Sequence, residues 1–149
     1  MPKVALIMGS KSDWPSLKGC VDVLKKFEIE VEVHVASAHR TPETVAAFAA
    51  NARENGFEVI IAAAGKAAHL GGVVAAYTPC PVITVPMKTS DLGGLDSLLS
   101  MVQMPSGVPV ACVAINGAKN AAILAVQMLG TGCDTARQKI IDFKADMAK

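Results

Sequence analysis

The chain has 149 residues, of which 52% are apolar and 18% charged, and its formal net charge is +1. This length suits one domain, and the near-neutral charge without a basic block disfavours a nucleic-acid partner. No apolar run approaches the ~20 residues that span a bilayer, and the apolar start of the chain is too short for a secretory signal. We therefore expect neither a membrane span nor a leader, and we expect the apolar surplus to be buried between subunits of a cytoplasmic homo-oligomer.

Strand-like and helix-like patterns alternate from one end of the chain to the other. Short aliphatic runs that end at glycine or proline predict buried strands, and apolar stripes at helical spacing predict helices. The segment 30–35 instead alternates strictly, which predicts a strand with one face in water and His34 pointing to solvent. In chain order the predicted elements are strand 4–8, helix 14–27, strand 30–35, helix 44–55 ended by Gly56, strand 57–64, helix 67–77, strand 81–85, helix 95–104, strand 108–115, helix 118–129 and helix 134–148.

This alternation is typical of a parallel sheet with helices on both faces. We predict a three-layer, doubly wound α/β fold with the flavodoxin-like, Rossmann-like strand order 2-1-3-4-5, as one domain over residues 1–149 with a C-terminal helix. The alternating strand is then an edge strand. Ligands bind such sheets outside the carboxyl ends of the strands, at the switch between strands one and three. That rule selects the loops 9–13 and 64–69 and, beside them, 37–41.

The loop 37–41 belongs to the run Ser37-Ala38-His39-Arg40-Thr41-Pro42. Histidine can give and take a proton near neutral pH, so His39 is a candidate acid–base group. Arg40 offers a rigid donor fork that suits phosphate or carboxylate. Thr41 and Pro42 are typical of an N-cap and a first helical residue, and we assign them structural roles.

The loop after the first strand reads Gly9-Ser10-Lys11-Ser12-Asp13, in which Gly9 permits a tight turn. The hydroxyls of Ser10 and Ser12 can donate to phosphate or sugar oxygens. Asp13 has two possible roles that the residues alone leave open: it accepts from a ribose diol, or it caps the next helix.

The loop 64–69 contains Gly65, Lys66 and His69. Its small residues open a predicted helix, so backbone N–H groups there could hold an anion, and Lys66 would add charge. His69 is either a second acid–base group or a hydrogen-bonded structural histidine.

Several functional classes lack their motifs in this chain. The three histidines have no metal-ligand spacing, and there is no Gly-x-Gly-x-x-Gly, Walker A or Gly-x-Ser-x-Gly run. No carboxylates follow the first and third strands, as a phospho-acceptor domain would need. The cysteines are scattered, which favours reduced thiols in a cytosolic protein; they are Cys20, Cys80, Cys112 and Cys133. After these exclusions, the site that best fits the residues binds a small phosphorylated sugar beside one side chain that can give and take a proton.

The motifs of residues 9–14, 37–42 and 64–70, together with 100–109, resemble the N5-carboxyaminoimidazole ribonucleotide mutase family of purine synthesis. This family is also described as the catalytic subunit of phosphoribosylaminoimidazole carboxylase, and the likeness is to its class I branch. The resemblance implies an octamer with no metal or organic cofactor, and a carboxylate that moves, as enclosed carbon dioxide, from the exocyclic nitrogen of the substrate to the adjacent ring carbon. It implies His39 as the catalytic residue, and it implies that Ser10, Asp13 and Arg40 hold the ribose and phosphate, with Ser12 and Ser37 nearby. From the loop 64–69 we add Gly65, Lys66 and His69 to the expected substrate-binding residues.

Three positions depart from the usual mutase pattern, in which Lys66 and Ala63 would be glycine and Gly71 proline. A basic residue after Gly65 is more similar to the sister branch, which carboxylates aminoimidazole ribonucleotide directly with carbon dioxide, whereas Arg40 and the histidine at position 69 match the mutase. Direct carboxylation by such a carboxy-lyase is therefore one alternative. A non-catalytic binder of a phosphorylated metabolite on the same sheet is another.

Overall fold

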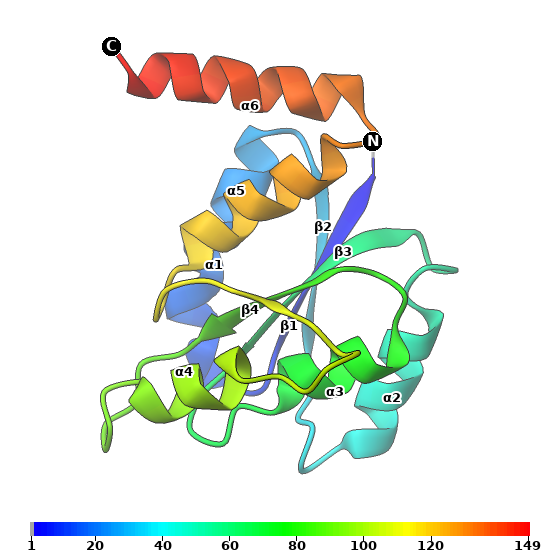
Figure 1. Ribbon diagram of the computed structural model, residues 1–149, viewed down its shortest axis with the longest axis vertical. Coiled ribbons are helices and arrows are strands. Elements are labelled where there is room, and N and C mark those ends of the chain that lie inside the picture. Colours follow the sequence, from blue (N-terminus) through cyan, green and yellow to red (C-terminus); the bar gives the residue numbers. More distant parts are fainter. Residues whose placement is uncertain (1) are drawn as a thin grey trace.

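The computed structural model describes residues 2–149 and confirms the predicted three-layer α/β fold with its C-terminal helix. One parallel sheet has the strand order β2-β1-β3-β4-β5, and helices cover both of its faces (Figure 1). The strands are β1 (Lys3–Met8), β2 (Glu30–Val35), β3 (Phe57–Ala64), β4 (Val82–Pro86) and β5 (Ala111–Cys112). The helices are α1 (Trp14–Lys26), α2 (Pro42–Asn51), α3 (Leu70–Tyr77), α4 (Leu95–Val102), α5 (Ala118–Leu129) and α6 (Asp134–Met147), and a single 3₁₀ turn spans Lys11–Asp13.

The sheet separates two apolar cores, because successive strand residues point to opposite faces. Val4, Leu6 and Met8 of β1 belong to the core under α1 and α5. Ala5 and Ile7 belong to the core under α2 and α3, on the other side of the sheet (Figure 1). All five side chains are at most 1% exposed, so β1 is covered on both faces, as its continuous aliphatic sequence predicts.

The edge strand β2 has the predicted position, but its two faces are reversed. His34 is half-buried, with its ring centroid 4.8 Å from that of Phe48 and 6.0 Å from that of Phe57. Val33 and Val35 are instead 42% and 47% exposed. The prediction that His34 faces solvent is therefore wrong, because Phe48 of α2 and Phe57 of β3 pack against its ring. On the aliphatic face, the core under α1 buries part of Val31 but leaves Val33 and Val35 largely exposed.

Lys3 of β1 links the edge strand to its neighbours on the same face of the sheet. The Lys3 ammonium donates to Glu32 at 2.7 Å and lies 4.3 Å from the centroid of the Phe57 ring. The hydrogen bond and charge of Lys3 hold the pKa of Glu32 below its ordinary value. On the open face, Trp14 lies beside the two valines and lines a shallow apolar surface with them.

Other predicted bounds differ for local reasons. The fifth strand is only two residues long, since Pro109 has no N–H for the ladder, although Val113 still donates to Thr84 O at 3.1 Å.

Helix α2 ends at Asn51, and Gly56, with φ +91°, closes a separate turn rather than the helix. Helix α3 begins at Leu70 rather than residue 67, because the left-handed backbone of Lys66 and a turn at 67–69 precede it. Helix α4 ends at Val102, before the segment that Pro105 keeps extended.

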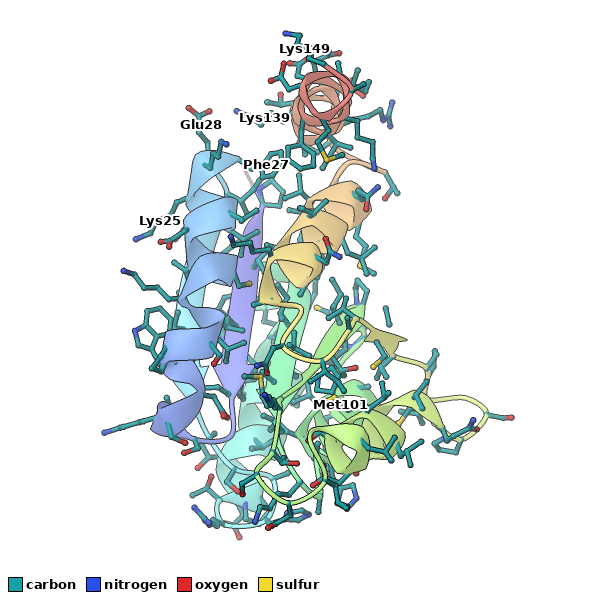
Figure 2. The ribbon with its side chains drawn as sticks, turned by 90° about the vertical axis from the view of Figure 1, so that its left-hand side faces the viewer. Lys25, Phe27, Glu28, Met101, Lys139 and Lys149 are labelled. Carbon is teal, nitrogen blue, oxygen red and sulfur yellow. The ribbon has the colours of Figure 1, made fainter. Side chains whose placement is uncertain are left out.

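The C-terminal helix α6 lies across the end of the molecule at which α1 finishes (Figures 1 and 2). Phe143 packs edge-on against Phe27 at a centroid distance of 5.6 Å, and the Lys139 ammonium donates to Glu28 at 2.7 Å. Glu28 has φ +60° at the left-handed position that ends α1. Within residues 2–149, no helix combines the length and the apolar character needed to cross a membrane.

Candidate functional site

A cavity of about 510 Å³ lies at the carboxyl ends of the strands, where the loops after β1, β2, β3 and β4 meet. This is the sheet edge at which doubly wound folds bind ligands. The three loops selected from the sequence all contribute to its wall. The predicted site residues that line it are Ser10, Ser12, Asp13, Ser37, His39, Arg40, Gly65 and Lys66. His69 does not line the cavity, but it contacts His39.

In the loop after β1, the two serine hydroxyls are hydrogen-bonded to each other. Ser10 Oγ lies 2.8 Å from Ser12 Oγ and also accepts from the Ser12 N–H at 3.3 Å. Asp13 occupies the N-cap position of α1, yet its side chain makes no capping hydrogen bond. Partial burial raises the pKa of Asp13 above its ordinary value. The geometry therefore leaves the carboxylate of Asp13 available to a ligand.

The loop after β2 is held rigid by its own hydroxyls. Ser37 Oγ accepts from the Arg40 N–H at 3.1 Å, and Thr41 Oγ1 both donates to Ser37 O and accepts from the Ser37 N–H, each at 3.0 Å. Thr41 is the N-cap residue and Pro42 the first helical residue, as predicted, but the Thr41 hydroxyl binds the loop rather than the helix. These bonds fix the backbone from which His39 and Arg40 extend, and both side chains are exposed toward the cavity.

The two histidines of the site form a pair. His39 Nε2 lies 2.9 Å from His69 Nδ1, and the rings meet edge to face at a centroid distance of 5.0 Å. One nitrogen must donate and the other accept, so this contact couples the tautomers of the two rings. A proton gained at one ring can be compensated at the other. This arrangement suits a group that both delivers and removes a proton.

The loop after β3 is anchored from the far side of the cavity. Lys66 has φ +55°, and its N–H donates to Ser97 Oγ at 2.9 Å. That amide is therefore occupied, so the predicted cradle of free backbone donors is wrong at this residue. The Lys66 ammonium donates to Asp91 at 3.0 Å, and this hydrogen bond and the charge of Asp91 raise the pKa of Lys66.

A fourth loop, residues 87–90 after β4, also lines the cavity, together with Leu70 of α3. No role for this loop was predicted from the sequence. The rule that selected the other loops could have found it, because β4 lies beside β3 and its carboxyl end points to the same edge. Lys88 adds a second lysine to this side of the cavity.

Along residues 2–149, no three histidine, cysteine or carboxylate side chains gather closely enough to bind a metal ion. The four cysteines are unpaired. The cavity combines the His39 imidazole, which His69 contacts from outside, with an arginine, two lysines, several hydroxyls and one half-buried carboxylate. Such a set can bind a phosphorylated sugar and move protons on a group attached to it.

Comparison with known proteins gives consistent matches over nearly the whole chain. The model of the AIR carboxylase family matches residues 3–149. An N5-carboxyaminoimidazole ribonucleotide mutase from Saccharolobus solfataricus is 57% identical over 147 residues, which cover 99% of this chain and 93% of that protein. One of the same name from Mycobacterium tuberculosis is 56% identical over 99% of this chain and 84% of its own length. The crystal structure of Treponema denticola PurE has a TM-score of 0.88 at 27% identity and covers 99% of this chain and 92% of that one.

Proposed function

The chain belongs to the AIR carboxylase family, and we propose that it is an isomerase of purine biosynthesis that interconverts N5-carboxyaminoimidazole ribonucleotide and 4-carboxy-5-aminoimidazole ribonucleotide. Relatives that are 54–57% identical over the whole chain carry the mutase name. The observation that carries the proposal is the His39–His69 pair at the wall of a cavity that also presents Arg40. The reaction needs a group that exchanges protons beside an anionic nucleotide.

The charges and hydroxyls of the cavity suggest how the nucleotide lies. Arg40 and the hydroxyls of Ser10 and Ser12 supply donors for the 5′-phosphate, with Ser37 shaping that loop. The carboxylate of Asp13 accepts from the ribose hydroxyls. The imidazole of the substrate then lies between His39 and the loop after β3.

The chemistry is a transfer in two balanced halves. In the first, the bond between the exocyclic nitrogen and the carboxyl carbon breaks, carbon dioxide is released, and the imidazolium of His39 gives a proton to the nitrogen. In the second, the nucleophilic ring carbon bonds to the same carbon dioxide, and the imidazole of His39 removes the proton of that ring carbon. The protein must therefore hold carbon dioxide in the cavity between the two halves. Lys66 also lies in the wall of this cavity, where the Asp91 carboxylate accepts from its ammonium.

We also propose that the active assembly is a cytoplasmic homo-octamer. A stripe of exposed apolar side chains follows α4 at helical spacing: Leu95 is 52%, Leu99 55% and Val102 48% exposed. Val33 and Val35 leave a second apolar surface uncovered. Contacts between copies would remove both from water. The mass of the particle in solution, measured by light scattering, tests this proposal, and a monomer would contradict it.

The enzymatic proposal is tested with substrate labelled in its carboxyl group, in buffer that contains unlabelled bicarbonate. A mutase keeps the label in the 4-carboxy product, whereas a carboxylase that uses free carbon dioxide dilutes it. His39→Asn should abolish interconversion and retain nucleotide binding. His34→Asn, which changes a histidine outside the cavity, should leave turnover per folded molecule intact. Binding by the wild-type chain without any interconversion would contradict the proposal and favour a non-catalytic binder.

A further inference from the structure

One hydroxyl outside the cavity joins two of the loops that line it. Ser97 lies on α4 and is completely buried. Its Oγ accepts from the Lys66 N–H at 2.9 Å and donates to Met87 O at 2.8 Å. Lys66 belongs to the loop after β3 and Met87 to the loop after β4. A single side chain thus bridges the backbones of the two loops that form the wall farther from the β2 loop, which carries His39.

Further contacts from the start of α4 support the same wall. Thr89 Oγ1 donates to Asp96 at 2.7 Å and accepts from the Gly94 N–H at 3.1 Å. Ser100 Oγ donates to Asp96 O at 2.7 Å and lies 3.3 Å from Lys66 O. Met101, which is 1% exposed, packs α4 into the core (Figure 2). Helix α4 is therefore a fixed support to which both loops are hydrogen-bonded.

The Ser97 bridge also holds a conformation that the chain would not adopt unaided. A lysine at φ +55° is strained, since side chains with a Cβ disfavour the left-handed region. The backbone of Lys66 is held at both its N–H and its carbonyl by hydroxyls of α4. Without the Ser97 hydroxyl, the partly buried Lys66 N–H and the buried Met87 carbonyl would each lose their partner. The two loops would then be free to separate.

We propose that Ser97 is a positioning residue for the carboxyl transfer, which keeps the loops after β3 and β4 closed so that carbon dioxide stays in the cavity until the ring carbon captures it. This inference rests on the proposed function. If the wall opens, carbon dioxide leaves after the bond to nitrogen has broken and the nitrogen has been protonated. The nucleotide that remains is uncarboxylated aminoimidazole ribonucleotide. Ser97 would thus control what fraction of the released carbon dioxide is transferred to the ring carbon and what fraction escapes from the cavity.

The test measures how much aminoimidazole ribonucleotide and how much 4-carboxy product form from N5-carboxyaminoimidazole ribonucleotide. The breakdown of the substrate without enzyme is measured separately and subtracted. For Ser97→Ala, we expect the ratio of aminoimidazole ribonucleotide to 4-carboxy product to rise about tenfold, since a small misplacement of a catalytic wall has large effects. Thr84→Val is the matched control. Thr84 is also completely buried, its hydroxyl has no hydrogen-bond partner within residues 2–149, and valine keeps its shape. This variant should keep the wild-type ratio.

The ratio separates positioning from simple loss of folded protein, because fewer folded molecules lower both products equally. Hydrogen exchange over residues 64–70 provides a second readout, and in Ser97→Ala it should accelerate there more than in α5. If the alanine variant does not fold, Ser97→Cys, which keeps the size and a weaker hydrogen-bonding group, should raise the ratio by a smaller factor. An unchanged ratio in a folded Ser97 variant overturns the inference alone. A wild-type protein that forms no 4-carboxy product overturns the proposed function instead.

Discussion

A side chain at position 71 has no room beside Thr84, and this predicts that the effect of substituting Gly71 depends strongly on the residue at position 84. A Cβ at position 71 would meet Thr84 Cγ2 at 2.2 Å and the Cβ of Ala62 at 3.7 Å. Thr84 is fully buried in the middle of β4, so its methyl cannot move into solvent.

The expected free energies follow from this geometry. Gly71→Ala in an open helix would stabilise the fold by up to about 1 kcal/mol. Here the overpacking costs about 1–3 kcal/mol, so the net effect is destabilising or close to zero. Thr84→Ser removes the methyl and by itself costs about 1 kcal/mol, because it leaves a small void. The added Cβ fills that void in the double variant, so the two changes together should cost less than their sum by about 2 kcal/mol.

The assay is urea unfolding of the four proteins at one fixed protein concentration, since assembly contributes to the apparent stability. The free energy of coupling between the two positions is the quantity of interest. Two results would refute the reasoning. One is a gain of about 1 kcal/mol from Gly71→Ala alone, which would mean that the helix has room for the methyl group. The other is strict additivity of the two substitutions.

Three further predictions concern charged groups. Arg40→Ala should weaken nucleotide binding by about 1.5–3 kcal/mol, the usual scale for a charged hydrogen bond, and calorimetric titration measures this; wild-type affinity would remove Arg40 from the phosphate site. Burial raises the pKa of Asp13, so wild-type stability should fall as the pH rises from the ordinary carboxyl pKa through the raised one. Thermal melts of Asp13→Asn should lack that fall, and parallel curves for the two proteins would contradict the assignment. Lys139 lowers the pKa of Glu28, so the stabilising contact is complete above the ordinary glutamate pKa and is lost as the pH falls through the lowered one. The stability difference between wild type and Glu28→Gln should vanish over that acid range, and a difference independent of pH would show that the ion pair contributes nothing.

The sheet and its ligand-binding edge could be predicted because each depends on local patterns. The aliphatic runs 4–8 and 57–64 correspond to strands buried on both faces. Strand order then brings the loops of Asp13, His39 and Lys66 to one cavity, as the rule for parallel sheets predicts. The fold class therefore follows from periodicity alone.

What could not be predicted depends on contacts between distant residues. The alternating sequence of β2 shows that its faces differ, but only the packing of Phe48 and Phe57 determines that His34 lies on the covered face. Likewise, the polar contact between His39 and His69 joins residues that are 30 positions apart. Ser97 looks like an ordinary helical serine until the structure shows what it bridges.

A structure of the protein with bound 4-carboxy-5-aminoimidazole ribonucleotide tests the account most directly. We predict that the nucleotide occupies the cavity at the carboxyl ends of β1 to β4, with its phosphate at Arg40 and its heterocycle within hydrogen-bonding distance of His39. A nucleotide bound elsewhere, or one whose heterocycle does not contact the His39 imidazole, would contradict it.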